Sequence, residues 1–296
     1  MTNLTVAQLE SRTVLVLTGK DVWDFLQNLI TNDMAQVSNT SGIYAALLTA
    51  QGKFLHDFFI LKSGDSYLLD CAADRKDDLV RRLTLYKLRA DVTITESDQS
   101  VFSLFGDFSS SAVNTPGKVG SIIDSDGVLY LADPRNLALG VRMYASEEFH
   151  PATMFPTATL AKEEAYDALR LRLGVPDGAR DILPEKNFLL EANFDELNGV
   201  SFTKGCYVGQ ELTARTKHRA KIKKRLFRIE YNGTLHSGDK ILQQGREIAD
   251  VRSFSNGQGL ALVRLESLPA NPEDLEPKGV KIVQPDYIDL PELQKQ

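Results

Sequence analysis

The chain has 296 residues, of which 43% are hydrophobic and 25% are charged, and its formal net charge is −6 at pH 7. This composition is typical of a globular protein with two or three modules, and no apolar run approaches the ~18 residues that a membrane span needs. Two cysteines exclude a disulfide framework. The N-terminal segment has the character of neither a secretory signal nor an organelle presequence, so we expect a bacterial cytoplasmic protein or, as the alternative, a processed mitochondrial one.

The first hundred residues predict strands mixed with helices. Residues 12–18 form a short strand, and the apolar spacing over residues 22–30 predicts a helix. The runs 43–50 and 54–62 are joined by a Gln-Gly-Lys turn and predict a hairpin. Further strands are expected at 66–72, 91–97 and 101–107, and an amphipathic helix at 74–89. This element order favours an α+β layer over a doubly wound sheet.

The later elements change in character twice. Residues 107–120 predict a loop, and the strands 128–134 and 137–145 predict a second hairpin. Residues 157–173 predict one long helix, with Leu160 in its apolar stripe and Gly174 as its stop. Four short strands then predict a small antiparallel barrel or sandwich beginning near residue 223: 225–231, 239–244, 246–254 and 259–266.

The segment SFTKGCYVGQELTARTKHR, residues 201–219, places Cys206 among glycines and cations. Gly205 and Gly209 permit backbone angles closed to other residues, so the chain can curl around the thiol. Good helix formers follow Gly209, which places Cys206 just before a positive helix end. This helix end and the neighbouring Lys204 favour the thiolate, which can attack or bind a soft metal. The alternative is a solvated basic helix with a chance cysteine.

Eight cations, counting one histidine, follow within eleven residues and predict a surface for an anionic partner. They are Arg215, Lys217, His218, Arg219, Lys221, Lys223, Lys224 and Arg225. No aromatic residues interleave the run, so nucleic acid is not the expected partner. Cys71 lies in a strand-like run, where a small buried hydrophobe is expected.

The run KGCYVGQE, Lys204 to Glu211, resembles the signature of the YgfZ/Iba57/Caf17 family, relatives of the aminomethyltransferase (T-protein) of the glycine cleavage system. Segments at 18–34, 47–60, 170–185 and 198–215 fit in the same order, and the continuation to residue 227 resembles the Iba57 branch most. The resemblance implies a GcvT-like, multi-subdomain, folate-binding α+β fold with a C-terminal antiparallel β-barrel. We expect 1–45 with 150–222 as one subdomain, 46–149 as an inserted subdomain, and 223–296 as the barrel.

The family implies a role in maturing iron–sulfur proteins, especially 4Fe-4S proteins, with tetrahydrofolate as ligand. The signature residues expected at the site are Lys204, Gly205, Cys206, Tyr207, Gly209, Gln210 and Glu211. The residues expected to hold the folate are Tyr166, Arg170, Glu191 and Arg215. The alternatives are that Tyr166 and Arg170 pack one helix face and that Glu191 is a surface acid.

A cluster normally takes four protein ligands, and the sequence has neither a C-x-x-C pair nor a Cys-rich tract, so this chain cannot hold a cluster alone. Cys206 would be one ligand, with the other thiolates from an A-type iron–sulfur carrier protein, or it would act as a redox thiol. Lys204, Arg215 and Lys217 would neutralise the anionic cluster.

We expect an assembly factor that is a monomer alone, serves 4Fe-4S client enzymes and has no membrane partner. The rival is a folate-dependent aminomethyltransferase. In the T-protein, an Asn-Ala pair ends the strand that here ends in Cys71-Ala72, and the T-protein lacks the signature thiol. These departures favour the assembly factor over the enzyme.

Overall fold

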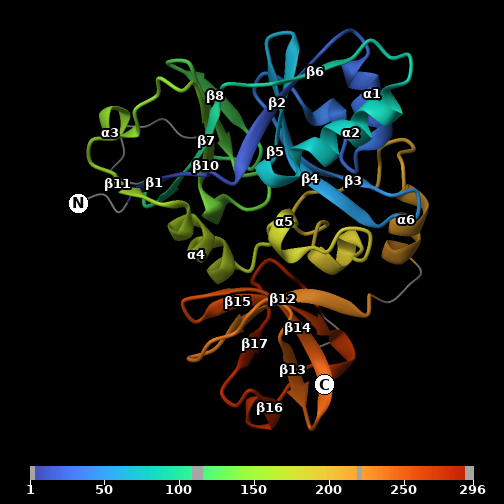
Figure 1. Cartoon of the computed structure of the whole chain (residues 1–296), viewed down its shortest axis with the longest axis vertical. Helices are drawn as coiled ribbons and strands as arrows, with labels where there is room; N and C mark the ends of the chain where they lie inside the picture. Colours follow the sequence, from blue (N-terminus) through green and yellow to red (C-terminus); the bar gives the residue numbers. More distant parts are fainter. Residues whose placement is uncertain (1–3, 109–115, 219–221, 291–296) are drawn as a thin grey trace. The chain divides into compact units, whose positions relative to one another are not determined.

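A computed structural model describes residues 4–108, 116–218 and 222–290 (Figure 1). The chain divides into two compact units. The first contains residues 1–48, 55–166 and 198–208, and the second contains residues 49–54, 167–197 and 209–296. Among the described residues, no helix is long and apolar enough to cross a membrane.

The first unit contains a five-stranded sheet in the order β3-β4-β5-β2-β6. Its strands are β2 (Arg12–Thr18), β3 (Ile43–Leu48), β4 (Phe54–Ser63), β5 (Ser66–Ala72) and β6 (Thr93–Glu96). All five are predicted strands, and the predicted hairpin of β3 and β4 is confirmed. Because β2 lies between β5 and β6, the sheet crosses the subdomain boundary that we expected at residue 45.

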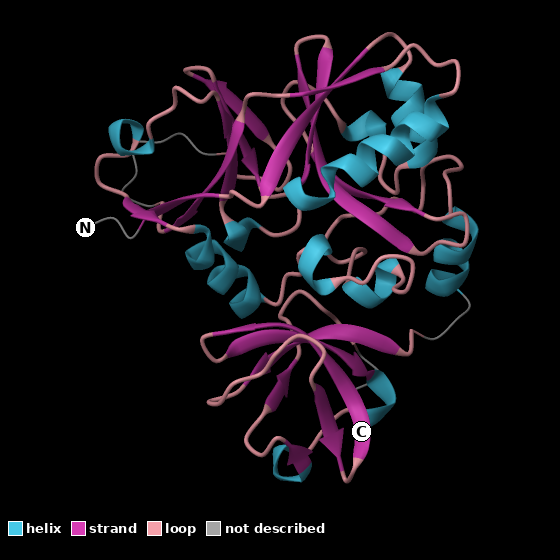
Figure 2. Ribbon diagram, in the orientation of Figure 1, coloured by secondary structure: helices cyan, strands magenta, loops and turns pink. Residues whose placement is uncertain are grey.

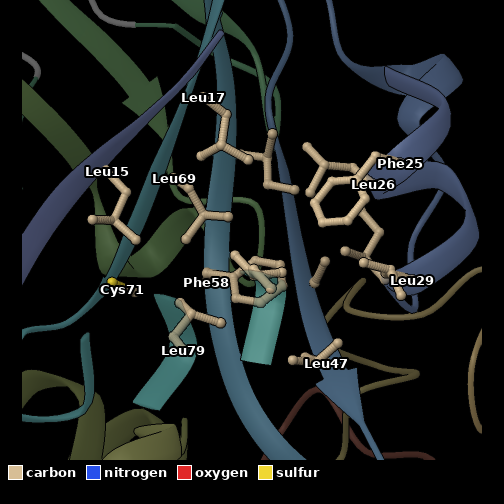
Figure 3. Close-up of a cluster of buried hydrophobic side chains, with 14 of the residues drawn as sticks. Leu15, Leu17, Phe25, Leu26, Leu29, Leu47, Phe58, Leu69, Cys71 and Leu79 are labelled. Carbon is tan, nitrogen blue, oxygen red and sulfur yellow. The ribbon is translucent and has the colours of Figure 1, made fainter. Parts of the chain in front are cut away.

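Two helices cover one face of this sheet: α1 (Val22–Leu29) and α2 (Lys76–Lys87). Figure 3 shows Phe25, Leu26 and Leu29 of α1 directed at apolar side chains of the strands. Leu79 and Leu83 of α2 are fully buried in the same cluster. The apolar periodicity of both helices is therefore explained by one shared core.

His56 lies in β4 and faces α2, where its Nε2 is 2.8 Å from Oδ2 of Asp78. Burial, reinforced by the charge of Arg75, lowers the pKa of His56 from 6.5 to about 4, although Asp78 opposes the shift. Between these two pH values the unfolded chain binds the proton more tightly than the folded chain. The unfolding free energy therefore has the full contribution of neutral His56 above pH 6.5 and loses it as the pH falls towards 4.

We expect this single histidine to cost about 2 to 3 kcal/mol of unfolding free energy between pH 6.5 and pH 4. Urea unfolding of the wild type and of His56→Gln at a series of pH values measures the effect. The glutamine cannot be protonated, so the difference between the two chains should shrink as the pH falls. A difference that is constant over this range would contradict the prediction.

The second sheet of the first unit has the order β11-β1-β7-β10-β9-β8. Its strands are β1 (Leu4–Gln8), β7 (Ser100–Gly106), β8 (Ile122–Ser125), β9 (Val128–Ala132), β10 (Val141–Ala145) and β11 (Thr159–Ala161). The predicted hairpin of β9 and β10 is confirmed. Part of the predicted loop at 107–120 lies outside the described residues.

The long helix predicted over residues 157–173 is wrong at its start. Residues Thr159–Ala161 form β11, which pairs in parallel with β1, and the helix α4 is Glu163–Leu173. Leu160 belongs to the strand and is 55% exposed. Pairing with β1, which is far away in the sequence, determined the conformation of residues 159–161 in spite of their helical apolar spacing. Gly174, at φ 75°, does end the helix as predicted.

A buried polar network joins the two sheets of the first unit. Asp70 of β5 is fully buried and accepts hydrogen bonds from Arg12 Nε at 2.7 Å, Arg142 Nε at 3.0 Å and the Tyr144 hydroxyl at 3.0 Å. Burial alone would raise the pKa of Asp70, but the charges of Arg12 and Arg142 outweigh it and hold the pKa below its ordinary value. Asp70 is therefore ionised and its charge is neutralised across the two sheets.

The second unit is built mainly from strands (Figure 2). Its sheet has the order β16-β13-β14-β15-β12-β17 and is antiparallel throughout. The strands are β12 (Lys224–Glu230), β13 (Lys240–Gln243), β14 (Arg246–Ser255), β15 (Gln258–Arg264), β16 (Leu275–Glu276) and β17 (Lys281–Val283). The four predicted strands are confirmed, and β16 and β17 were not predicted. The unit also contains α5 (Gly178–Asp181) and α6 (Gln210–His218).

Candidate functional site

The two cysteines lie in opposite environments. Cys206 is exposed, in the loop just before α6. Cys71 is 2% exposed in β5, and burial raises the pKa of its thiol to about 12. At neutral pH Cys71 is therefore a protonated core residue, as expected, and Cys206 is the thiol that a partner or a metal can reach.

Lys204 fastens the loop of Cys206 to the end of α1. Its Nζ donates hydrogen bonds to the backbone carbonyls of Gln27 at 2.7 Å, Ile30 at 2.8 Å and Asn32 at 2.7 Å. The last carbonyls of a helix have no partner within the helix and carry partial negative charge, so a buried ammonium there satisfies both needs. Burial lowers the pKa of Lys204 to about 8.

This placement corrects the role that we expected for Lys204. An ammonium that donates to three carbonyls and is only 7% exposed does not stand ready to neutralise a cluster or to activate the thiol. Lys204 instead fixes the backbone from which Cys206 projects. Its Nζ also lies 5.2 Å from the ring centroid of the buried Tyr207, so a second signature residue stabilises the same anchor.

Backbone contacts continue this attachment on both sides of Lys204. Thr31 donates its hydroxyl to the Gly199 carbonyl at 2.7 Å, and the amide of Ser201 donates to the Thr31 carbonyl at 2.9 Å. The amide of Val208 donates to the Asn28 carbonyl at 3.3 Å. Residues 199–208 are thus held along the C-terminal end of α1, and Cys206 is exposed on a supported loop.

The two glycines that flank the thiol differ. Gly209, directly before α6, has φ 81°, a backbone angle that glycine adopts without steric cost. Gly205 has no positive φ, and a Cβ there would meet no heavy atom within 4 Å, so the bend that we expected at Gly205 is wrong. Gln210 begins α6 half-buried, and Glu211 is exposed in its first turn.

Sequence reasoning predicted the turn at Gly52 but missed that this turn packs against the start of α6. Gly52 has φ 71°, and a Cβ on it would lie 3.0 Å from the Gly209 carbonyl oxygen and 3.1 Å from Cβ of Leu212. A larger residue would be strained at this φ and would crowd both atoms. The Gln-Gly-Lys turn was the available signal, but a turn glycine alone does not say which segment it packs against.

The basic run is divided by its contacts. Arg215 is exposed, but Lys217 pairs with Asp195, and Arg225 is 3% exposed and contacts Glu196 at 2.5 Å. The continuous cationic face that we expected is therefore wrong for Lys217 and Arg225, whose charges are balanced by acids. Residues 219–221 lie outside the described part of the chain.

Three of the residues expected to hold tetrahydrofolate contact other parts of the protein. The Tyr166 hydroxyl accepts a hydrogen bond from Arg135 at 2.7 Å and is buried. Arg170 is 2% exposed and contacts Asp167 at 2.5 Å and Asp181 at 2.6 Å. Glu191 caps its own helical turn, accepting from the Phe188 amide at 2.9 Å. The division between the two units falls within α4, between Tyr166 and Arg170.

These contacts decide whether the expected residues fit tetrahydrofolate. Tyr166 and Arg170 are core residues, which agrees with the alternative that they pack their helix, and the Glu191 carboxylate serves the backbone. The polar groups of Tyr166, Arg170 and Glu191 are therefore engaged within the protein and do not fit a folate, and no step of a reaction is assigned to one. In the described part of the chain, no group of three or more His, Cys, Asp and Glu residues could hold a metal ion.

Comparison with known proteins gives the family context. Residues 223–289 match the family described as "CAF17, C-terminal beta-barrel domain". The chain is 30% identical over 286 residues to the mouse protein named "Iron-sulfur cluster assembly factor IBA57, mitochondrial", covering 89% of this chain and 78% of the mouse protein. The human protein of the same name is 30% identical over 283 residues, covering 88% and 78%. A Neurospora crassa homologue is 33% identical over 232 residues, covering 75% of this chain and 52% of its own.

A solved structure supports the expected fold. The glycine cleavage system aminomethyltransferase T from Bartonella henselae matches with a TM-score of 0.78 at 12% identity, over 97% of this chain and 87% of that one. At this identity the likeness shows the fold alone. The prediction of a GcvT-like α+β fold with a C-terminal antiparallel β-barrel is confirmed.

Proposed function

This chain belongs to the IBA57 family, and from that membership we propose that it is an iron–sulfur cluster assembly factor whose working group is the Cys206 thiol. The observation that supports this assignment most is the exposure of Cys206 on a loop held by Lys204, while Cys71 is buried in β5. A thiolate that binds a cluster must be reachable and must be held in place. Cys206 meets both conditions.

The cluster is the cargo of this proposal. The chain has two cysteines and one of them is buried, so it supplies at most one accessible thiolate. A cluster that needs four ligands takes the others from a partner, for which we propose an A-type carrier protein. We propose that Arg215 of α6 contacts the anionic cluster or partner. Arg215 is exposed, whereas Lys217 and Arg225 pair with acids.

The clients of this activity are proposed to be 4Fe-4S enzymes. The curated relatives are named mitochondrial, so the proposed work belongs in mitochondria if the source is eukaryotic and in the cytoplasm if it is bacterial. Tetrahydrofolate binding is a separate element of the proposal that needs residues other than Tyr166, Arg170 and Glu191. Isothermal titration of tetrahydrofolate into the wild type tests it directly, and no heat of binding would remove it.

Co-purification tests the central claim. The wild type, Cys206→Ser and Cys71→Ala are each mixed anaerobically with an A-type carrier that holds a reconstituted cluster, then separated by gel filtration with visible absorption. We expect a coloured complex with the wild type and with Cys71→Ala, and none with Cys206→Ser. Because residue 206 lies on an exposed loop, the melting temperature of Cys206→Ser should equal that of the wild type.

The cysteine control makes the outcome specific. Cys71→Ala removes a thiol from the core, so it should lower stability while the complex persists. A coloured complex with Cys206→Ser would contradict the ligand role. If the wild type forms no coloured complex but forms a reversible mixed disulfide through Cys206, the result would favour a redox thiol. Turnover of an aminomethyl donor with tetrahydrofolate would instead make the chain a transferase.

A further inference from the structure

Asn32 lies just after α1, and both polar atoms of its buried side chain have two hydrogen-bond partners. Its Nδ2 donates to the Tyr44 carbonyl at 2.8 Å and to the Asn198 carbonyl at 2.8 Å. Its Oδ1 accepts from the Asp33 amide at 2.9 Å and from Gln36 Nε2 at 3.3 Å. The donor end of the amide therefore faces acceptors and the acceptor end faces donors, which fixes the orientation of the side chain.

Asn32 contacts the segment that carries Cys206 at two points. We call residues 198–208 the thiol segment. The Asn32 side chain donates to the carbonyl of Asn198, where the thiol segment begins, and the Asn32 carbonyl accepts from Lys204 Nζ at 2.7 Å. One residue thus holds both the beginning of the thiol segment and the lysine two positions before the thiol.

The strand β3 supports residues 31 and 32. The Thr31 amide donates to the Ala46 carbonyl at 3.0 Å, and the Ala46 amide donates to the Thr31 hydroxyl at 2.8 Å. Asn32 adds the bond to the Tyr44 carbonyl. All six residues of β3 are buried. The thiol segment is therefore held, through residues 31 and 32, by a strand of the core.

The partners of Asn32 explain why an asparagine stands here. The Tyr44 and Asn198 carbonyls need donors, whereas the Asp33 amide needs an acceptor. Asparagine offers two donors and an acceptor on one short side chain. An ionised aspartate has nearly the same shape but no donor, so one of its oxygens would face two carbonyls. Shape alone does not satisfy this position.

We infer that Asn32 is a positioning residue for the Cys206 thiol. The role rests on the proposed function, because a thiol that shares a cluster with a second protein must meet the metal from a fixed direction. Lys204 fixes one point of the thiol segment, and the Asn32 side chain fixes a second. The backbone that leads to Cys206 is then held at two points instead of one.

Three variants of the full-length chain separate positioning from packing. Asn32→Ala removes the side chain but keeps the carbonyl that binds Lys204. Asn32→Asp keeps the shape and removes the donors. Asn28→Ala is the matched control, because Asn28 is exposed and its Nδ2 donates to the Asp24 carbonyl of its own helix at 2.8 Å. All measurements are made at a temperature at which circular dichroism shows every variant folded.

A nitroxide spin label on Cys206 reports the motion of the thiol segment without any partner. Cys71 is 2% exposed in β5, so the label reacts at Cys206. We expect slow label motion, measured by electron paramagnetic resonance, in the wild type and in Asn28→Ala. Both Asn32 variants should give faster motion. A residue that only fills space would leave the motion unchanged in Asn32→Asp.

Binding to an A-type carrier with a reconstituted cluster gives the functional readout. The affinity of Asn32→Ala should fall about tenfold, the loss expected when a buried acceptor loses its donor. The affinity of Asn32→Asp should fall at least as far, and Asn28→Ala should bind as the wild type does. A packing role predicts the opposite order, with Asn32→Asp close to the wild type.

Wild-type label motion in Asn32→Ala would overturn the positioning role. Faster motion with unchanged affinity for the carrier would overturn it as well, because the place of the thiol would then not matter for binding. If the wild type itself forms no complex, the proposed function fails. The label motion is measured on the protein alone, so it still decides whether Asn32 holds the thiol.

Discussion

An Asp70→Asn variant is expected to lose about 3 to 5 kcal/mol of unfolding free energy, because it removes the negative partner of a buried charge network. The asparagine has the shape of the aspartate but presents an amide in place of a carboxylate. Arg12 and Arg142 would then keep their positive charges in the core without the acid that accepts from both. Since these arginines come from different sheets of the first unit, the two sheets should separate more readily.

Urea unfolding of the wild type and the Asp70→Asn variant measures this loss. Asp65→Asn is the matched control, since Asp65 is exposed in the turn that precedes β5 and should change stability by less than ~0.5 kcal/mol. Hydrogen exchange should show faster exchange in β10, where Arg142 and Tyr144 lie. Equal stability of the Asp65 and Asp70 variants would mean that the network is not electrostatically important.

Replacing Lys204 by methionine should cost about 3 kcal/mol and abolish the coloured cluster complex. Methionine nearly preserves the side-chain volume but donates no hydrogen bond. The carbonyls of Gln27, Ile30 and Asn32 would lose their shared donor at the end of α1. The loop that carries Cys206 would then no longer be held in one position.

Hydrogen exchange distinguishes this positioning role from a general loss of stability. The amides of Ser201 and Val208 donate to residues 31 and 28, so both should lose protection before the core of the five-stranded sheet does. Lys278→Met is the control, because Lys278 is exposed. Unchanged protection at Ser201 and Val208 in Lys204→Met would show that the loop does not depend on the ammonium.

Local patterns predicted the elements but not how distant segments meet. The apolar periodicity of α1 and α2 and the strand-like apolar runs of β2 to β5 are properties of neighbouring residues, and they predicted these elements within a few positions. β11 failed because its three residues are defined by parallel pairing with β1, more than 150 positions earlier. β16 and β17 are too short to carry a periodic signal.

The site divides in the same way. The exposure of Cys206 and the special backbone angle of Gly209 before α6 were predictable, because both depend on local composition and turn chemistry. The partner of Lys204 was not, because a lysine beside a cysteine looks the same in sequence whether its ammonium faces the thiol or the end of another helix. Arg170 was misassigned for a related reason. Its partners Asp167 and Asp181 became visible only when the chain was folded.

The cap of α1 is supplied by a residue 172 to 177 positions further along the chain than the carbonyls it binds. At a synthesis rate of ~5 to 20 residues per second, about 9 to 35 s pass between the emergence of the helix and that of its cap. During this interval a growing chain can pair the strands of its five-stranded sheet, but the carbonyls at the end of α1 still lack the Lys204 donor. The thiol arrives together with its anchor. A nascent chain therefore cannot present a supported Cys206 until more than two thirds of the protein has left the ribosome.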